Sequence, residues 1–465
     1  MLREIGSVDM GEINRRATRE TEKARHKTIA NDQLDGIIVS EEYRTVQELL
    51  KTGYPIVFVT GNAGTGKTTL IHYLKNLLER NVVVLAPTGV AALNAGGMTI
   101  HSFFHFPPKI HEDEDIKLVH NRKLYKKLEL LIIDEVSMVR CDLMDSTDKF
   151  LQKNRSSRKP FGGVQLLLVG DLFQLPPVVS KHEGEVLGKK GYTSPYFFSS
   201  FGPQKTSMVP AELTSIYRQE DSKYIDFLNR IRVGDDIEYI IDELNQQCCE
   251  LNNFQPDITL TCTNKLADKI NDEELKNLPS EEFLFRGTIE GQFSLDKDKL
   301  PSPMDLKLRV GTRVMFTKND GQKRWVNGSI GIVREIEQRT IMVELVSDSR
   351  GMVYDVHPEI WENYKYSYDS EKDEIIANKV GQYTQYPLMH AWAVTIHKSQ
   401  GKTLDNVLID LGRGAFAFGQ VYVALSRCRS IEGFRLARPI QQTDVKCDSM
   451  IKQFYISLED MMRII

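Results

Sequence analysis

GNAGTGKT at residues 61–68 is the segment from which the architecture of this chain follows. It matches the pattern G-x-x-x-x-G-K-[ST] and lies between an apolar run, YPIVFVTG, and a helical pattern, TTLIHYLKNLLER. In such a loop the glycines let backbone N–H groups close around a phosphate, and the helix N-terminus adds its positive end. Because both flanking elements are present, the segment predicts a nucleoside-triphosphate site rather than a chance glycine-rich loop.

The side chains of this loop and of a later acidic pair define the expected chemistry. Lys67 would neutralise oxygens of the β- and γ-phosphates, and the hydroxyl of Thr68 would bind Mg²⁺. Asp134 and Glu135 end the apolar run ELLIIDE, where side chains emerge at the edge of a sheet. Asp134 can hold Mg²⁺ and Glu135 can polarise the attacking water, so ATP and Mg²⁺ are the expected cofactors. The expected nucleotide-binding residues are Gly61, Ala63, Gly64, Thr65, Gly66, Lys67, Thr68 and Thr69.

Further apolar runs indicate the fold class. NVVVLAP, ELLIIDE and VQLLLVGD lack alternation, which is typical of strands buried on both faces of a parallel sheet covered by helices. The same texture returns in ITLTCTN and NVLIDL, and the sequence between them alternates more and is rich in turns, which predicts a small β-barrel. We therefore expect an α/β fold of two domains with parallel sheets. The predicted boundaries are a flexible charged arm at 1–38, a first domain at 39–204 with a short irregular insertion at 103–126, a second domain at 205–283 and 386–465, and a β-rich insertion at 284–385.

Composition excludes several classes of protein. No stretch approaches the ~20 apolar residues of a membrane span. The first residues, MLREIGSVDMGEINRR, carry no apolar signal core, so we expect a cytoplasmic protein of the bacterial or phage-nucleoid type, without secretion or transit signal. The 6 cysteines form no C-x-x-C pair, which argues against an iron–sulfur cluster. The net charge of −4 gives no global nucleic-acid signal, so any polyanion would need a local basic groove.

Three polar residues follow the phosphate loop at wider spacing. Gln174 in GDLFQLPPV can sense the γ-phosphate and transmit its loss to the following linker. Arg218 in IYRQ and Arg427 in VYVALSR can stabilise charge in the transition state of phosphoryl transfer. A lone arginine is usually a surface charge, so Arg218 and Arg427 by themselves do not decide between a catalytic role and an ordinary surface position.

Taken together, the motifs resemble a known set in a known order. GNAGTGKTTL, APTGVAALNAGGMTIHSFF, LLIIDEVSM, LLLVGDLFQLPPV and VYVALSRCR are similar to motifs of the Pif (petite integration frequency) helicases of superfamily one, in the branch that includes RecD. The resemblance covers about residues 40–436. It implies two RecA-like domains with ATP between them, with Arg218 and Arg427 as arginine fingers and Gln174 as sensor. The β-rich insertion and the 103–126 stretch would correspond to the family's accessory domain and strand-separating wedge.

The resemblance also implies an activity and a partner. We expect an ATP-driven helicase that moves 5′ to 3′ along single-stranded DNA, unwinds duplexes at DNA forks, and acts in replication, repair, recombination or telomere-type maintenance. We expect it to be monomeric in solution. An ATP-switched scaffold or clamp, and the helicase subunit of a recombination nuclease, are the alternatives. For Phe103, base stacking and core packing are equally open. The implied DNA-binding residues are Thr88, His101, Phe103, Asn264, Thr395, His397 and Lys398.

One position departs from the family pattern. Many relatives carry a glutamine about 17 residues before the phosphate loop to read adenine, and Tyr43 stands at that place here. Gln47 follows one helical turn later. The sequence leaves open whether Tyr43 or Gln47 reads adenine, so it supports hydrolysis more directly than a preference for ATP over other nucleotides.

Overall fold

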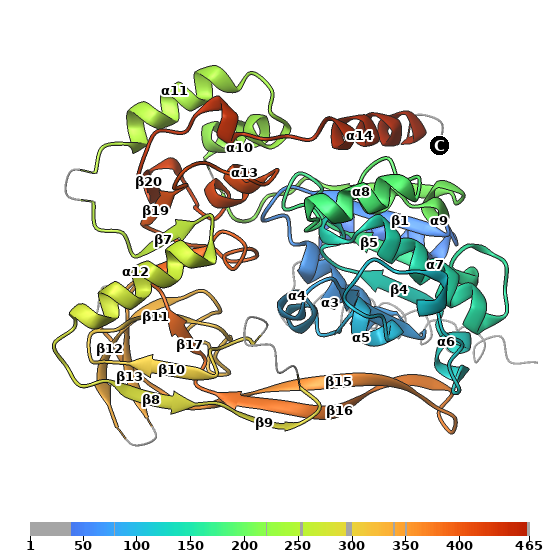
Figure 1. Cartoon of the computed structure of the whole chain (residues 1–465), viewed down its shortest axis with the longest axis horizontal. Coiled ribbons are helices and arrows are strands. Elements are labelled where there is room, and N and C mark those ends of the chain that lie inside the picture. Colours follow the sequence, from blue (N-terminus) through green and yellow to red (C-terminus); the bar gives the residue numbers. More distant parts are fainter. Residues whose placement is uncertain are drawn as a thin grey trace, which may run out of the picture.

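The computed structural model describes residues 39–462, except 79, 220, 252–253, 294–299, 338–339 and 349–350. The charged arm expected at 1–38 lies outside the described residues. Figure 1 shows an α/β domain on the right, a second α/β domain at the upper left, and a β-rich insertion below the second domain. Within the described ranges, no helix combines the length and the apolar character needed to cross a membrane.

The first domain is built on a six-stranded parallel sheet with the strand order β3-β2-β4-β5-β1-β6. Every residue of the first and fourth strands is buried, as the unbroken apolar runs predict. Parallel strands require crossover connections, and helices supply them on both faces. The strands are β1 (Ile56–Gly61), β2 (Val82–Ala86), β3 (Met98–Thr99), β4 (Leu130–Ile133), β5 (Gln165–Val169) and β6 (Met208–Leu213).

Alternate residues of β1 face two different cores. Val57 and Val59 pack with the first two helices of the domain, whereas Ile56 and Phe58 pack with the aromatic side chains on the other face. The helices are α2 (Glu41–Lys51), α3 (Lys67–Leu77), α4 (Gly89–Asn94), α5 (Ile100–Phe104), α6 (Lys123–Lys127), α7 (Cys141–Arg155), α8 (Lys181–Lys189) and α9 (Phe201–Gln204). Short 3₁₀ turns lie at η1 (Asp113–Asp115), η2 (Val136–Met138), η3 (Pro160–Gly163) and η4 (Phe197–Ser199).

The second domain has a four-stranded parallel sheet in the order β18-β7-β19-β20. It assembles from segments far apart in the sequence, because the β-rich insertion separates β7 from the other three strands. The strands are β7 (Ile258–Thr261), β18 (Ala393–Thr395), β19 (Val407–Asp410) and β20 (Phe434–Leu436). The helices and turns are α10 (Ser222–Val233), α11 (Ile237–Cys248), α12 (Asn264–Asn277), α13 (Gln420–Leu425), η6 (Ile431–Gly433) and η7 (Gln442–Asp444).

The insertion contains three antiparallel sheets. A five-stranded sheet, β14-β13-β12-β11-β17, and a pair, β10-β8, share one apolar core, so the predicted barrel takes the form of two sheets around a common core. A third sheet, β15-β16-β9, contains a long hairpin that runs beneath the first domain (Figure 1). The strands are β8 (Phe283–Arg286), β9 (Thr288–Gly291), β10 (Asp305–Leu308), β11 (Arg313–Phe316), β12 (Ile330–Ile336), β13 (Ile341–Leu345), β14 (Val353–Val356), β15 (Glu359–Asp369), β16 (Glu374–Gln385) and β17 (Leu388–His390).

Several predicted boundaries differ from the structure. β6 pairs with β1, so the first domain extends beyond residue 204, and β17 extends the insertion beyond residue 385. A final helix, α14 (Ser449–Met462), lies over the first domain (Figure 1), where Ile451 and Leu458 join its core. The irregular stretch predicted from residue 103 begins only after α5, because the last residues of that helix are buried. The position of α14 depends on an apolar surface of the first domain, which segments distant in the sequence build.

Candidate nucleotide and nucleic-acid site

A cavity of about 600 Å³ lies between the two α/β domains. The phosphate loop, Glu135 and Gln174 contribute one wall, and the loops that precede α10 and follow β18 and α13 contribute the other. Most of the predicted nucleotide residues therefore meet in one place. The lining residues are Tyr43, Ala63, Gly64, Gly66, Lys67, Thr68, Thr69, Glu135, Gln174, Tyr217, Arg218, Gly401, Thr403, Arg427 and Arg429.

The phosphate loop depends on backbone shapes that favour glycine. Gly66, the N-cap residue before α3, has a φ of 81°, and a Cβ on Gly61 would lie 2.5 Å from the carbonyl oxygen of Leu213. Gly61 and Thr65 do not line the cavity, and the Thr65 hydroxyl donates to the Asn62 carbonyl at 3.0 Å. These two predicted nucleotide residues therefore shape the loop instead of forming the cavity wall.

The Lys67 ammonium is hydrogen-bonded to the backbone of the phosphate loop. It donates to the carbonyl oxygens of Gly61 and Asn62, at 2.8 Å each. Burial lowers the pKa of Lys67, and the carboxylates of Asp171 and Glu135 oppose that shift. The ammonium is thus positioned over the loop, close to where the loop's N–H groups would bind phosphate oxygens.

The acidic pair follows β4 in a strained turn. Glu135 has a φ of 50°, and its backbone N–H donates to Asp134 Oδ1 at 2.8 Å. Burial raises the pKa of Asp134 to about 6, and burial together with Asp134 raises that of Glu135 to about 7. The side chain of Thr68 is hydrogen-bonded to Asp134, which brings two oxygen ligands together. These two oxygens suit Mg²⁺, which is usually held by one or two protein ligands together with phosphate oxygens and water. Among the described residues, no group of three or more His, Cys, Asp or Glu side chains could hold a metal ion by itself.

The two predicted arginine fingers line the opposite wall. Arg218 Nε donates to Thr403 Oγ1 at 3.0 Å, and its Nη1 donates to the Ser426 carbonyl at 3.1 Å. Arg427 is 1 % exposed and donates to the Val423 carbonyl and the Ser426 hydroxyl. Burial and the neighbouring Arg218 lower the pKa of Arg427 to about 9. Both guanidinium groups are therefore held at the cavity by oxygens of the second domain.

A residue that the motifs did not single out connects the two walls. Gln400 Nε2 donates to Glu135 Oε2 at 3.1 Å and to Gln174 Oε1 at 3.3 Å. It lies in the polar run HKSQGKT, which begins two residues after the end of β18. That position after a buried parallel strand was the available signal, since polar side chains there reach the edge of the sheet.

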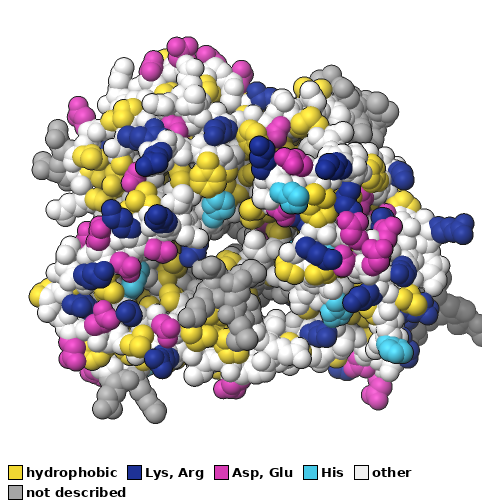
Figure 2. Space-filling view, in the orientation of Figure 1, with side chains coloured by type: hydrophobic (Ala, Val, Ile, Leu, Met, Phe, Trp, Pro, Cys, Tyr) yellow, Lys and Arg dark blue, Asp and Glu magenta, His cyan; other side chains and the backbone are white. Residues whose placement is uncertain are grey.

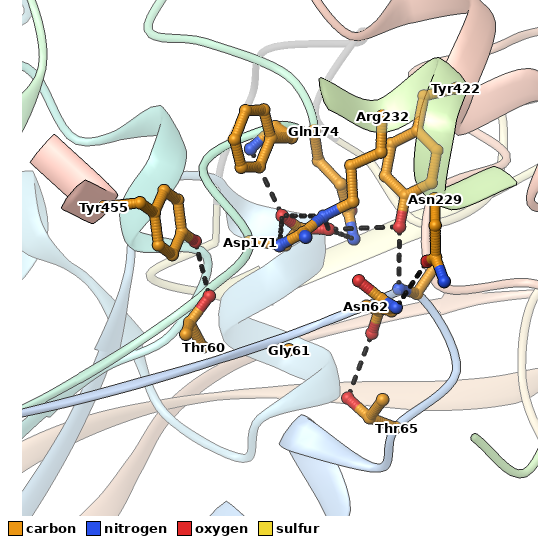
Figure 3. A network of polar contacts seen from close by, with 12 residues as sticks. Thr60, Gly61, Asn62, Thr65, Asp171, Gln174, Asn229, Arg232, Tyr422 and Tyr455 are labelled. Atoms are coloured by element: carbon orange, nitrogen blue, oxygen red, sulfur yellow. Dashed lines mark hydrogen bonds and ion pairs between the residues drawn. The ribbon is translucent and has the colours of Figure 1, made fainter. Parts of the chain in front are cut away.

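Asp171 is the centre of a second connection between the domains (Figure 3). It is fully buried beside Gln174, whose Nε2 donates to it at 3.4 Å. From the second domain, Arg232 Nη2 donates to Asp171 Oδ1 at 3.0 Å and the Tyr422 hydroxyl donates to Oδ2 at 3.2 Å. Tyr422 in turn accepts from the backbone N–H of Ala63 in the phosphate loop. Gln174 and helices α10 and α13 therefore share one buried carboxylate, and Tyr422 links it to the phosphate loop.

Aromatic rings enclose this ion pair. The Arg232 guanidinium lies 4.6 Å from the ring centre of Phe173, and Tyr455 of α14 stacks on Phe173 at 5.1 Å. The Tyr455 hydroxyl is hydrogen-bonded to Thr60 at the end of β1 (Figure 3). The C-terminal helix thus closes the pair off from solvent, which strengthens its electrostatic attraction.

The predicted DNA residues divide between the domains. His101 is half-buried on α5, and Thr88 caps α4 by accepting from the Ala91 N–H. Asn264 is exposed at the start of α12, and Lys398 is exposed after β18. His397 beside it is half-buried, and burial lowers its pKa. Figure 2 shows basic and acidic side chains interspersed over one face of the molecule, in agreement with the small net charge.

The side chains of two predicted DNA contacts are buried in this structure. Phe103 is 3 % exposed and packs edge-to-face on Phe104 and Tyr125, so its ring is not available to a base. Thr395 is buried, and its hydroxyl accepts from the Lys398 N–H at 3.3 Å. Its position therefore suits holding the turn that presents His397 and Lys398.

Comparison with known proteins identifies the family. The family model described as PIF1-like helicase matches residues 40–238. The chain is 33% identical to the ATP-dependent DNA helicase Pif1 of Bdellovibrio bacteriovorus, over 86% of this chain and 88% of that protein. The chain belongs to the PIF1-like helicase family.

Other members of the PIF1-like family agree with this assignment. The rat protein, ATP-dependent DNA helicase PIF1, is 34% identical over 90% of this chain, which spans only 64% of the rat protein's length. The Bacteroides Pif1 structure with ADP-AlF4 matches with a TM-score of 0.83 at 36% identity, over 91% of this chain and 98% of that one. A structure of Bacteroides Pif1 bound to single-stranded DNA matches with a TM-score of 0.64 at 37% identity, over 91% of this chain and 98% of that one. The expected fold class, two RecA-like domains with a β-rich insertion, is confirmed.

The structure distinguishes Tyr43, which replaces the glutamine of the family pattern, from the nearby Gln47. Tyr43 lines the cavity, and its hydroxyl donates to the Gly66 carbonyl at 2.8 Å. Gln47 does not line the cavity and accepts from the Tyr73 hydroxyl at 3.4 Å. Of the two candidates, Tyr43 is the one that faces the nucleotide site.

Proposed function

We propose that this protein is an ATP-dependent DNA helicase that moves 5′ to 3′ along single-stranded DNA and unwinds duplexes. The observation that carries the proposal is the cavity between the RecA-like domains, where Lys67 and Glu135 of one domain face Arg427 of the other. A site divided between two domains can couple hydrolysis to their relative movement.

The side chains have separate roles in hydrolysis. Lys67 binds the β- and γ-phosphate oxygens, and Glu135 accepts a proton from the attacking water. Arg218 and Arg427 stabilise the charge that develops in the transition state. Thr68 and Asp134 would hold Mg²⁺, which neutralises phosphate charge when bound.

The Asp171 connection offers a route from hydrolysis to movement. Gln174 contacts Asp171 on one side and Gln400 on the other, so a change at the γ-phosphate reaches both domains through this one residue. Arg232 of α10 and Tyr422 of α13 both donate hydrogen bonds to the Asp171 carboxylate. Loss of the γ-phosphate would therefore weaken contacts that hold the cleft closed.

DNA binding is the second half of the proposal. His101 on the first domain, and Asn264, His397 and Lys398 on the second, give each domain its own potential grip on a strand. Alternating grips during opening and closing produce stepping. The 5′ to 3′ sense follows from similarity to the Pif and RecD branch, and the Bacteroides structure bound to single-stranded DNA supports the choice of ligand. We propose a monomer as the working unit, although one Bacteroides structure describes two coordinating helicases at a fork.

The proposal is tested by ATP hydrolysis with and without single-stranded DNA. A motor should hydrolyse ATP much faster when a DNA strand is bound, because strand binding favours the closed cleft. Hydrolysis that is insensitive to single-stranded DNA would favour an ATP-switched scaffold instead.

A further inference from the structure

The two ends of the nucleotide cavity differ in chemical character. Phosphates bound over Gly64–Lys67 would direct their γ end toward Glu135 and Gln174, because those side chains lie with Gln400 on that side. The ribose and base must then leave past Gly66, in the direction of Thr69 and helix α2. The side chains at this base end determine which nucleotides the site accepts.

Tyr43 closes the base end from the first domain. Its side chain is 2 % exposed and belongs to the core under α2, and its hydroxyl donates to the Gly66 carbonyl. The hydroxyl also interacts with the side chain of Thr69. The hydrogen of this phenol is therefore committed to the phosphate loop. A phenol offers one donor and one acceptor site, whereas reading the edge of a base takes a correctly spaced pair directed at the base.

Tyr217 supplies a flat aromatic face at the same end. Its backbone N–H donates to the Gly64 carbonyl at 3.0 Å, which fixes the residue against the phosphate loop. Its ring lies beside Gly66, yet the residue is 54 % exposed, which is unusual for a large aromatic side chain. An exposed ring at the mouth of a nucleotide cavity is suited to stacking on a base.

The other charged side chains near this end make their contacts outside the cavity. Glu42 Oε1 accepts from the backbone and hydroxyl groups of Thr214 and Ser215, and its buried Oε2, which has no hydrogen-bond partner among the described residues, belongs to a residue that does not line the cavity. Arg429 at the cavity mouth lies 3.6 Å from Asp405. Among the described residues that line the cavity, only Gln174 carries a carboxamide, and it lies at the phosphate end.

We propose that this site accepts nucleoside triphosphates as a class, with Tyr217 stacking on the base and Tyr43 shaping the phosphate loop without reading the base edge. This inference rests on the proposed nucleotide hydrolysis. Sites that pair buried polar groups with a substrate reject analogues by large factors. Stacking tolerates every base, because each base has a π-face.

The direct test is equilibrium binding of ADP, GDP, CDP and UDP to the full chain with Mg²⁺, measured by calorimetry. The four dissociation constants should agree within about tenfold, with the larger purines the tighter pair. ADP binding more than about a hundredfold tighter than the other three would overturn the inference.

Variants of the two tyrosines assign the roles. Tyr217→Ala should weaken binding of all four nucleotides by a similar factor of about ten, and Tyr217→Phe should keep the parent affinities. Tyr239→Ala, which removes an exposed tyrosine from α11, is the matched control and should change nothing. A loss confined to ADP in Tyr217→Ala would show that the residue reads adenine, contrary to the inference.

Tyr43→Gln tests the other half. It places a carboxamide at the base end and should raise the preference for ADP over GDP by about tenfold or more, whereas Gln47→Ala should leave the order unchanged. An unchanged order in Tyr43→Gln would contradict the role given to Tyr43. If that variant fails to fold, the Tyr217 series decides alone.

Hydrolysis of the four triphosphates separates this inference from the proposed function. If the four diphosphates bind equally and no triphosphate is hydrolysed, the inference that the site does not read the base is supported and the helicase proposal is contradicted. If ATP alone is hydrolysed and the other nucleotides do not bind, the helicase proposal is supported and the inference is contradicted.

Discussion

The two halves of the nucleotide cavity hold their charged groups in different ways. On the first domain, Lys67 donates to carbonyls of its own loop, and Asp134 lies beside Glu135. On the second, Arg218 and Arg427 donate to hydroxyl and carbonyl oxygens of that domain. We propose that the first half can bind a nucleotide alone, whereas the second half acts only when the cleft is closed. The difference separates nucleotide binding from turnover, and each variant below tests that separation.

The largest effect is expected for Lys67→Ala. It removes the ammonium that neutralises phosphate charge in both the ground state and the transition state, so kcat/KM for ATP should fall by about ten-thousandfold. Steady-state hydrolysis and nucleotide binding should both be lost. Lys75→Ala, on the exposed side of the same helix, should retain the parent rate. Hydrolysis near the parent rate in Lys67→Ala would reject the site.

Arg427→Ala and Arg218→Ala should affect turnover without binding. Each should lower kcat by about a thousandfold and leave ADP affinity within about threefold, because the guanidinium acts on transition-state charge. Rapid-mixing hydrolysis and calorimetry separate the two quantities. Arg413→Ala, an exposed arginine of the same domain, is the control. An equal loss of binding in either variant would erase the proposed difference between the halves.

Glu135→Gln tests whether turnover can be lost without loss of binding in the first half of the cavity, where Glu135 lies. The amide cannot accept a proton from water, so kcat should fall by about several hundredfold while Thr68 and Asp134 still support nucleotide and Mg²⁺ binding. Collapse of Mg²⁺-nucleotide affinity would identify Glu135 as a metal ligand. The roles of the two acidic residues would then be exchanged.

The smallest effect on chemistry is expected where the halves meet. Arg232→Met leaves Asp171 buried without its ion partner, which should cost about 3 kcal/mol of unfolding free energy. Arg230→Met on the same helix removes exposed ion pairs and should cost under about 1 kcal/mol.

A double variant tests whether Arg232 acts through Asp171. Adding Asp171→Asn to Arg232→Met should cost much less than the sum of the single changes, in denaturant unfolding and in DNA-stimulated hydrolysis. Additive losses would show that the pair does not couple the domains.

Local patterns predicted much of this architecture. The buried strand β1, the glycine-rich turn and the α3 N-terminus follow one another in the sequence, and their chemistry can be read without knowledge of distant contacts. The acidic pair after β4 was found in the same way. Parallel strands place such side chains at one edge of the sheet, whereas the position of the site between two domains was expected from the resemblance to the Pif helicases.

Contacts between distant segments were not predictable in this way. Asp171 and Arg232 are 61 residues apart, and each reads locally as an ordinary polar residue. Phe103 has the same sequence signature whether it faces DNA or the core, and the neighbouring Tyr125 and Tyr366 decide the matter. The packing of α14 on the first domain likewise depends on a surface that only the assembled fold exposes.

The central claim is that closure of the two halves on ATP moves the protein 5′ to 3′ along a DNA strand. The most direct measurement is strand separation on two partial duplexes of equal sequence, one with a 5′ single-stranded tail and one with a 3′ tail. With ATP and Mg²⁺, the protein should unwind the 5′-tailed substrate, more weakly as salt rises, and Lys67→Ala should unwind neither. Unwinding only from the 3′ tail would contradict the direction, and unwinding from neither by the parent protein would contradict the motor.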